Sequence, residues 1–193
     1  FGYVEGYNMI QTNSIDFLNY RALFNYNIPP NWNLNRLKYF SIKVQTGTTP
    51  PTSQSEYFED EINWFTPADF NDKFLLTSSS RMISKLAIKD GVGRLFPANT
   101  ILLVSIGTVG KVGLSKDPCS ANQQINAIIP NSKMLPKFLT YYLSAHSDMI
   151  NALANTTLLS ILNQEKTKQI GVLVPSLSEQ QSIAQFLDYK TEQ

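Results

Sequence analysis

The chain has 193 residues, of which 42% are hydrophobic and 16% are charged, so it is long enough for one substantial folded domain. It contains no uncharged apolar run of membrane-spanning length, and its N-terminus lacks the basic-then-apolar layout of a signal peptide. Cys119 is the single cysteine, which excludes an internal disulfide and fits a reducing compartment. These features predict a cytoplasmic domain with no membrane attachment.

The net charge of +1 conceals two segments of opposite sign. Residues 56–72 hold six acidic side chains and no basic one, whereas residues 73–116 hold seven basic side chains and Asp90 as their one acid. Basic side chains gathered without carboxylates suit a phosphate backbone, because their binding releases condensed counterions. A solvated basic face without a ligand is the alternative that charge alone leaves open.

The N-terminal part of the chain predicts few regular elements. Residues 15–23 allow one short helix, which the prolines at positions 29 and 30 would end because proline has no backbone donor. We expect a strand over residues 37–44, then a turn over residues 46–51. A partly buried strand is expected within the acidic segment 56–72.

The clearest β signal lies in the middle of the chain. Residues 101–106 form a short apolar run typical of a core strand, residues 107–110 supply a glycine-rich turn, and a return strand follows from Lys111. Further short strands are predicted over residues 124–130 and 171–175.

Helices are expected late in the chain. Pro136 suits the first turn of a helix, because its missing donor costs nothing there. Behind it, side chains recur at helical spacing: Phe138, Tyr141, Tyr142, Ala145 and Met149. Ser178 with Gln181 three residues on has the layout of a capping box for a last helix, whose apolar stripe is Ile183, Phe186 and Leu187. This order predicts an α+β fold, a mostly antiparallel or mixed small sheet with flanking helices and a C-terminal helix.

Two nucleotide-binding motifs are incomplete. Residues 105–112 resemble a phosphate-binding loop, but Ser105 and Val112 stand where the Walker pattern needs a glycine and a hydroxyl. Residues 27–30 resemble the Asn-Pro-Pro-aromatic signature of adenine methyltransferases, but Ile28 interrupts it. No glycine-rich loop leads from a strand into a helix as a cofactor site would require, since the glycine-rich turn 107–110 leads into a return strand.

Metal and nucleophile chemistry has little support in the sequence. His146 is the only histidine, and no second soft ligand stands near it. No orienting group accompanies a Cys119–His146 pair. We therefore expect no catalytic centre, no cofactor and no metal.

Polar side chains suited to DNA accompany the basic segment. Asn and Gln can make bidentate contacts to adenine in the major groove, and arginine suits phosphates and guanine. Ordinary loop chemistry is the competing explanation for the same residues. The candidate DNA-contacting residues are Thr48, Thr49, Ser79, Arg81, Lys85, Lys89, Arg94, Thr108, Lys111, Asn122, Gln123 and Gln124. We prefer Gln123 and Gln124 for adenine readout, and expect the acidic segment 56–72 to face away from DNA or to brace this face.

Seven short motifs follow one another over residues 29–191. They are Pro30-Asn31-Trp32 with Leu37-Lys38-Tyr39; Gly47-Thr48-Thr49-Pro50; Tyr57-Phe58 with Ile62, Trp64 and Ala68-Asp69; Ile83-Ser84 with Ala87-Ile88, Leu95-Phe96-Pro97 and Thr100-Ile101-Leu102; the glycine hairpin 107–113; Asn122-Gln123; and Pro175-Ser176-Leu177-Ser178-Glu179-Gln180 with Ile183-Ala184 and Phe186-Leu187-Asp188. In this order they resemble a target-recognition domain of a type I restriction–modification specificity subunit, although each motif alone is weak.

The resemblance implies a domain organisation. Residues 1–28 fall outside the match, residues 29–177 would form the DNA target-recognition domain, and residues 178–193 would begin the family's conserved spacer and dimerisation helix. A full specificity subunit carries two recognition domains, separated by helices that set the distance between half-sites, and this chain resembles one half.

The resemblance also implies a function. The domain would read one half of a bipartite site in double-stranded DNA. It would hold DNA adenine methyltransferase subunits and, in the full complex, a restriction and translocase subunit. The cofactor and the chemistry would belong to these partners, so the chain itself would not be an enzyme.

Two other functions remain open at this point. A fragment of a nucleic-acid methyltransferase or nuclease would need a cofactor loop or a carboxylate–lysine metal site, and binding of S-adenosylmethionine by the isolated chain would reveal it. A protein-interaction module would use its aromatic surface. Duplex DNA binding with steep salt dependence would argue against that module.

Overall fold

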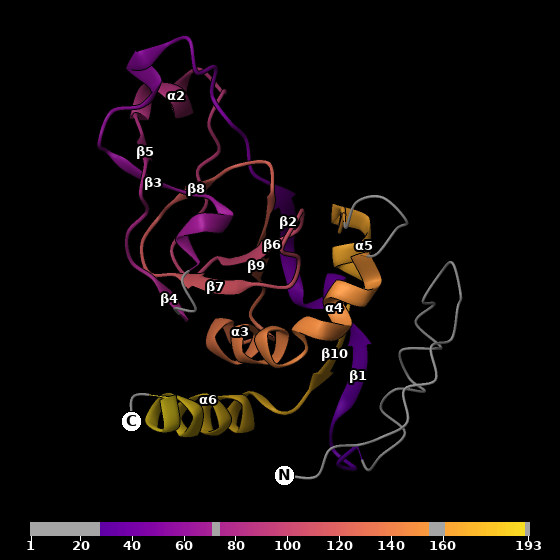
Figure 1. Cartoon of the computed structure of the whole chain (residues 1–193). Coiled ribbons are helices and arrows are strands. Elements are labelled where there is room, and N and C mark those ends of the chain that lie inside the picture. Colours follow the sequence, from indigo (N-terminus) through magenta and orange to yellow (C-terminus); the bar gives the residue numbers. More distant parts are fainter. Residues whose placement is uncertain (1–27, 71–73, 155–160, 192–193) are drawn as a thin grey trace.

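The computed structural model describes residues 28–70, 74–154 and 161–191 of the chain (Figure 1). The short helix expected over residues 15–23 lies outside these ranges. The described residues form three small sheets, with helices packed at their faces and ends.

The largest sheet has five strands. Its order is β2 (Ser41–Thr46), β9 (Ile125–Pro130), β6 (Ile101–Val104), β7 (Val112–Ser115) and β4 (Leu75–Leu76). The first three pairings are antiparallel, and β4 pairs with β7 in parallel. The expected core strand, glycine turn and return strand are thus confirmed as β6 and β7, and the expected strand over residues 124–130 as β9.

Two smaller sheets complete the β structure. The strands β1 (Asn33–Arg36) and β10 (Gly171–Val174) form an antiparallel pair, and β10 confirms the strand expected over residues 171–175. The strand β3 (Ile62–Phe65) lies between β5 (Met82–Ile83), which is antiparallel to it, and β8 (Ser120–Ala121), which is parallel. The predicted α+β fold with small antiparallel and mixed sheets is confirmed.

Helices lie at both ends of the molecule and beside the sheets between them. The described α-helices are α2 (Lys85–Lys89), α3 (Pro136–Ala145), α4 (Ser147–Ala154), α5 (Gln164–Gln169) and α6 (Leu177–Thr191). The short 3-10 helices are η1 (Leu37–Phe40), η2 (Ser55–Tyr57) and η3 (Pro67–Asp69). Figure 1 shows α2 with β3 and β5 at one end of the molecule and α6 beyond α3 at the other.

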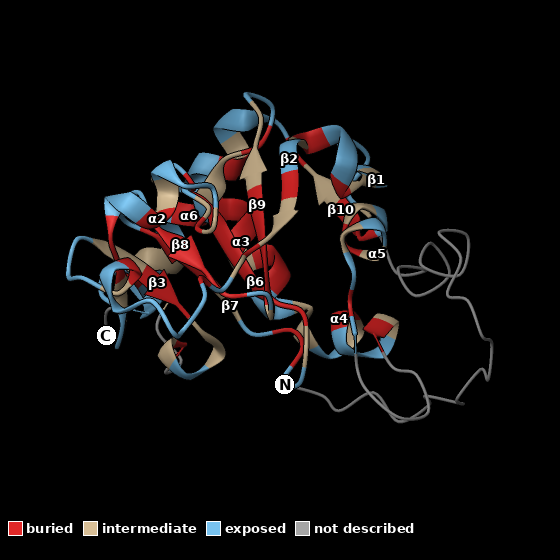
Figure 2. Ribbon diagram, turned by 90° about the horizontal axis from the view of Figure 1, so that it is seen from above, coloured by how far each residue is buried: buried red, intermediate tan, exposed pale blue. Residues whose placement is uncertain are grey.

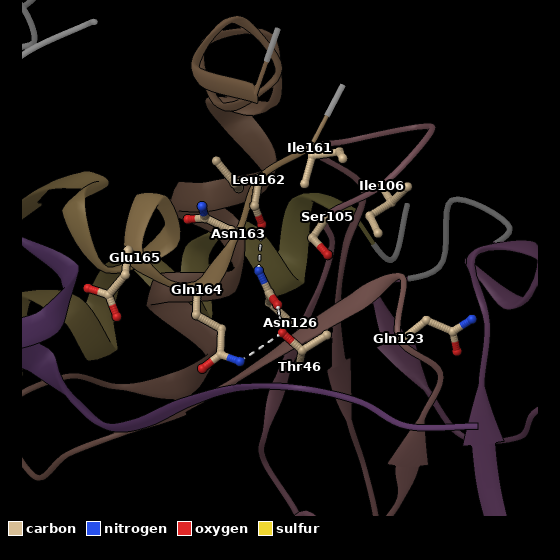
Figure 3. Close-up of a pocket in the computed structure, with 10 residues that line it drawn as sticks. All are labelled: Thr46, Ser105, Ile106, Gln123, Asn126, Ile161, Leu162, Asn163, Gln164 and Glu165. Carbon is tan, nitrogen blue, oxygen red and sulfur yellow. Dashed lines mark hydrogen bonds between the residues drawn. The ribbon is translucent and has the colours of Figure 1, made fainter. Parts of the chain in front are cut away.

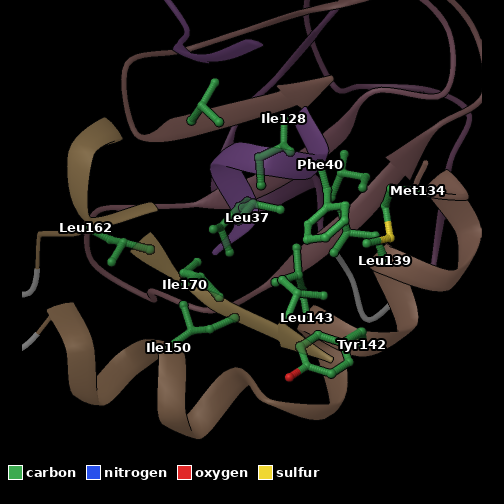
Figure 4. Packing of buried hydrophobic residues seen from close by; sticks show 14 of the residues in the cluster. Leu37, Phe40, Ile128, Met134, Leu139, Tyr142, Leu143, Ile150, Leu162 and Ile170 are labelled. Atoms are coloured by element: carbon green, nitrogen blue, oxygen red, sulfur yellow. The ribbon is translucent and has the colours of Figure 1, made fainter. Parts of the chain in front are cut away.

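The strand β6 is buried on both faces, which explains its unbroken apolar sequence. Ile101 and Leu103 face the main core, which includes η1, β9, α3 and α4 side chains (Figure 4). Leu102 and Val104 point the opposite way into a second core, with Phe65 and other side chains. A third, smaller cluster lies under α2: Tyr57, Trp64, Ile83 and Ala87. In the view of Figure 2, the buried residues run through β6, β8 and β9, while the outer face of α2 is exposed.

The strand expected over residues 37–44 was placed too early. Leu37 and Phe40 are buried three residues apart, a spacing that a 3-10 turn satisfies and an alternating strand does not. Residues 37–40 therefore form η1, and the strand begins at Ser41. The strand expected in the acidic segment is confirmed as β3.

The predicted stripe behind Pro136 was partly wrong. The helix begins at Pro136 as expected and buries Phe138 and Tyr142, but Ala145 is exposed. The helix ends at Ala145, so Met149 belongs to α4.

The predicted capping box of the last helix was two residues late. The Ser176 hydroxyl, rather than that of Ser178, accepts the backbone N–H of Glu179 at 3.3 Å. Of the predicted stripe, Ile183 packs against the main core, whereas Phe186 is 60% exposed. Gln180 replaces it as the buried anchor, because its amide accepts the Leu135 N–H at 2.8 Å and donates to the carbonyls of Lys133 and Pro175.

Candidate nucleic-acid interface

The helix α2 presents two lysines to solvent. Ser84 caps the helix by accepting the N–H of Ala87 at 3.2 Å, and Ala87 is buried, so Lys85 and Lys89 point outward. The Glu61 carboxylate accepts the Lys85 N–H at 2.6 Å and pairs with its Nζ at 3.1 Å. These contacts lower the pKa of Glu61. The acidic segment thus contacts the basic helix at its first turn and braces it.

Arg81 lies against two aromatic rings next to this helix. Its guanidinium carbon is 4.6 Å from the Phe58 ring centre and 5.2 Å from that of Trp64. Ser79 lies against β3: its hydroxyl accepts the Trp64 N–H at 3.0 Å and donates to the Arg81 carbonyl at 2.6 Å. Ser79 is therefore engaged in positioning β3 and Arg81, whereas the Arg81 side chain is exposed.

The loop after β2 packs onto the turn before β9. A side chain at Gly47 would collide with the carbonyl oxygens of Ala121 and Asn122, so glycine permits this close approach. The Thr48 N–H donates to the Ala121 carbonyl at 2.8 Å. The hydroxyl of Thr49 donates to the side-chain oxygen of Gln123.

The amide cluster divides into one exposed and two engaged side chains. Asn122 is 7% exposed, donates to the Gln124 side chain at 3.0 Å and accepts the Gln124 N–H at 3.0 Å. Direct DNA contact by Asn122 does not fit this burial, because its side chain shapes the turn from within. Gln124 is half-buried, and Gln123 is the exposed member of the cluster.

Arg94 is another predicted contact that the fold uses internally. It is half-buried, and its Nη1 donates to the Thr46 carbonyl at the end of β2. This contact ties the segment after α2 to the loop that carries Thr48 and Thr49.

Thr108 and Lys111 lie on the hairpin between β6 and β7. Both are exposed, and the hairpin glycines Gly107 and Gly110 have positive φ angles of 82° and 99°. A side chain at Gly110 would approach the Ser147 carbonyl to 2.8 Å. The hairpin therefore rests on the start of α4, away from α2.

A pocket of about 460 Å³ joins Gln123 to the hairpin (Figure 3). It is lined by Thr46, Ser105, Ile106, Gln123, Asn126, Ile161, Leu162, Asn163, Gln164 and Glu165. In its floor, Asn126 accepts the Thr46 hydroxyl at 2.8 Å and donates to the Leu162 carbonyl at 2.8 Å. Gln164 also points toward Thr46 and donates to its hydroxyl at 3.0 Å.

These floor residues were not among the candidates that the sequence indicated. Asn126 offered a signal, since it is a single polar residue within the apolar run of β9. A buried amide in a core strand needs partners for all its hydrogen-bonding groups. Gln164 carried no such signal in the sequence, because it lies on a short polar helix far along the chain.

A second open pocket, of about 570 Å³, lies on the other side of Gln123. Its lining residues are Gly47, Thr48, Thr49, Pro51, Gly91, Val92 and Gln123. Gly91 and Val92 directly follow α2. Gln123 thus stands between the segment after α2 and the Gly107 hairpin, and lines both pockets.

The described residues hold no group of three or more His, Cys, Asp or Glu side chains placed to bind a metal. Burial raises the pKa of the Cys119 thiol to about 12, which keeps it protonated and a poor nucleophile. No helix among the described residues is both long and apolar enough to cross a membrane.

The sequence profile of the type I restriction modification DNA specificity domain matches residues 29–192. The chain belongs to this family. The membership confirms the resemblance that the order of the seven motifs indicated.

Curated relatives of this specificity domain are named specificity subunits. The type I restriction enzyme MjaIX specificity subunit of Methanocaldococcus jannaschii is 32% identical over 166 residues, which cover 84% of this chain and 38% of the relative. The type I restriction enzyme EcoR124I/EcoR124II specificity subunit of Escherichia coli is 30% identical over 149 residues, which cover 74% of this chain and 37% of the relative. The chain therefore spans less than half the length of these relatives.

Solved structures of the family share the fold of this specificity domain. The HsdS subunit from Thermoanaerobacter tengcongensis superposes with a TM-score of 0.68 at 19% identity, over 87% of this chain and 39% of that one. The S subunit of a type I restriction–modification system from M. genitalium superposes with a TM-score of 0.61 at 20% identity, over 88% of this chain and 41% of that one.

The family motifs of this specificity domain fall where distant segments meet. Gly47 of the Gly-Thr-Thr-Pro motif contacts the backbone of Asn122 in the Asn-Gln motif. Trp32 of the first motif donates to Glu179 of the last at 3.0 Å. These four motif residues thus serve the scaffold, and the buried contact of Gly47 with Asn122 holds the turn that carries Gln123.

Proposed function

We propose that this chain binds double-stranded DNA in a sequence-specific manner and reads one half of a bipartite site for a type I restriction–modification complex. Membership of the specificity-domain family supports the proposal. The observation that carries it is the position of Gln123, an exposed amide between two open pockets, with basic side chains on the elements that border them.

Two classes of contact follow from this arrangement. Lys85 and Lys89 lie on α2, which precedes the Gly91–Val92 segment of the second pocket, and Lys111 lies on the hairpin that follows Ser105 and Ile106 of the first. These lysines would bind phosphates, which position the protein on the duplex. Gln123 would contact a base edge, because an amide can pair with adenine in the major groove. Its carbonyl accepts the Thr49 hydroxyl, which fixes the orientation in which the amide meets a base.

We propose residues 29–177 as the target-recognition domain and residues 178–193 as the start of the spacer helix. The partners would be DNA adenine methyltransferase subunits and, in the full complex, a restriction and translocase subunit. One solved structure with a TM-score of 0.70 to this chain comes from work on complex assembly of a type I system. The exposed face of α6, with Phe186 and Tyr189 at 60% and 61% exposure, would take part in such assembly.

In this proposal the chain is not an enzyme, and methyl transfer belongs to the partner subunits. The incomplete nucleotide motifs at residues 27–30 and 105–112 support this view. Purified chain incubated with labelled S-adenosylmethionine and duplex DNA should transfer no methyl group above background. Transfer without an added subunit would instead favour the methyltransferase alternative.

The decisive experiment is selection of bound duplexes from a randomised library by the intact complex, followed by titration at several salt concentrations. We expect enrichment of one half-site that depends on this chain. Replacing Lys85, Lys89 and Lys111 together by alanine should reduce both the affinity and its salt dependence. Unchanged affinity and salt dependence would place DNA on another face of the molecule.

A further inference from the structure

The side chain of Arg81 differs from the other basic side chains near α2 in how it is held. Its backbone carbonyl accepts the Trp64 N–H at 3.1 Å, which fixes the chain beside β3. The guanidinium then lies over the Phe58 ring and within 5.2 Å of the Trp64 ring. Contact with two rings holds the guanidinium in place and reduces the rotamer freedom that binding would otherwise cost.

The two rings form a rigid platform. They meet edge to face, with centres 6.1 Å apart and an interplanar angle of 78°. Trp64 is 3% exposed, and its indole N–H donates to the Thr48 carbonyl at 2.9 Å. The two rings that contact Arg81 therefore belong to the third core cluster or pack against it.

The guanidinium of Arg81 has no carboxylate or hydrogen-bond acceptor among the described residues. Two acids of the neighbouring segment are engaged elsewhere: Glu61 with Lys85, and Asp69 with the N–H groups of Thr66 and Ser80. A charged group with five donors is thus held against the rings and exposed, with its donors available to a ligand.

We propose that Arg81 is a specificity-determining residue that reads a guanine, by donating two hydrogen bonds to O6 and N7 in the major groove. The inference rests on the proposed function and adds a base and a residue to it. A phosphate contact needs a positive charge but no fixed plane, and the exposed Lys85 and Lys89 provide such charges. A planar guanidinium that the rings hold in place presents two parallel N–H donors, and these match the O6 and N7 acceptors of guanine.

The same platform links Arg81 to Gln123. Trp64 holds the Thr48 carbonyl, and the next residue, Thr49, donates to Gln123. Both candidate readers are therefore positioned by one continuous set of contacts. They read bases of the same half-site, and a change in the platform affects the base read by Arg81 first.

The test is duplex selection and titration with the intact complex carrying Arg81→Ala, Arg81→Lys or Phe58→Leu. In Arg81→Ala, one guanine position should become degenerate, and affinity for the cognate site should fall about 10- to 100-fold while the remaining positions keep their preference. Phe58→Leu keeps the charge but removes one ring, so the same position should lose about 2- to 5-fold discrimination. Arg81→Lys should retain binding to random DNA and lose discrimination at this position.

The outcomes separate this inference from the proposed function. An equal loss on all sequences, with the salt slope lowered by about one, would identify Arg81 as a phosphate contact and overturn the inference. Loss of base preference at a position where the selected base is not guanine would overturn the inference as well. If the unmodified complex selects no half-site through this chain, the proposed function itself fails. Should Arg81→Ala not fold, the other two variants decide, since both keep a large side chain.

Discussion

The indole N–H of Trp32 donates to the carboxylate of Glu179 at 3.0 Å, across 147 residues of sequence. Trp32 immediately precedes β1, and Glu179 lies in the first turn of α6, where a carboxylate also interacts favourably with the helix N-terminus. This hydrogen bond fixes the beginning of the last helix against the beginning of the described fold.

We expect Trp32→Phe to lower the free energy of unfolding by about 1–2 kcal/mol, because a partly buried charged acceptor loses its donor. Glu179→Gln keeps an acceptor for the indole and should cost about half as much or less. Urea unfolding followed by circular dichroism would measure both. Equal, negligible effects would show that the bond contributes nothing to stability.

Lys111 is exposed on the hairpin that borders the first pocket. If it binds a phosphate, Lys111→Ala should weaken binding of the intact complex to cognate and scrambled duplexes alike, and lower the salt slope by about one. Lys133→Ala removes the same charge from the exposed segment before α3, which lines neither pocket, and should change neither quantity. A sequence-dependent loss in Lys111→Ala would mean that Lys111 contacts a base.

Phe186 and Ile183 lie on the same helix but differ in burial. Phe186 is 60% exposed, whereas Ile183 packs against the main core. Phe186→Ser should leave the thermal unfolding of the chain unchanged within a few degrees and weaken the proposed assembly with methyltransferase subunits. Ile183→Ser should lower the free energy of unfolding by about 1–3 kcal/mol. Co-purification and calorimetry would separate the two, and undiminished assembly of Phe186→Ser would exclude this face as the contact.

Cys119 is buried, and its pKa is raised to about 12 by the loss of hydration. The folded state therefore favours the neutral thiol more than the unfolded state does, where the pKa is about 8.5. The stabilisation is complete below that value and is lost as the pH rises from about 8.5 toward 12. A thiol-reactive dye at pH 8 should accordingly label the protein slowly until denaturant is added.

The matched control for this prediction is Cys119→Ala. Tyrosines titrate over the same pH range in both proteins, so the difference in unfolding free energy isolates the thiol. That difference should shrink with rising pH by up to about 1.4 kcal/mol per unit. Rapid labelling of the native protein at pH 8 would contradict the burial of the thiol.

Several features of the fold followed from the sequence because they depend on neighbours along the chain. The apolar run of β6, the glycine turn and the start of α3 at Pro136 are local patterns with local physical causes. The order of the motifs indicated the family by another route, since motif residues such as Gly47 lie where distant segments meet.

The amino-acid sequence was enough to predict the α+β class, the strands β3, β6, β7, β9 and β10, and the excess of basic side chains between residues 73 and 116. Which polar side chains are available to a ligand depends on the folded structure. Asn122, Gln123 and Gln124 are chemically alike, yet Asn122 is buried and Gln123 is exposed, because the turn folds back on β3 and the loop after β2. Arg81 and Lys85 carry the same charge, but one lies on aromatic rings and the other pairs with Glu61. Burial and pairing arise from contacts between residues far apart in the chain, and no local pattern encodes them.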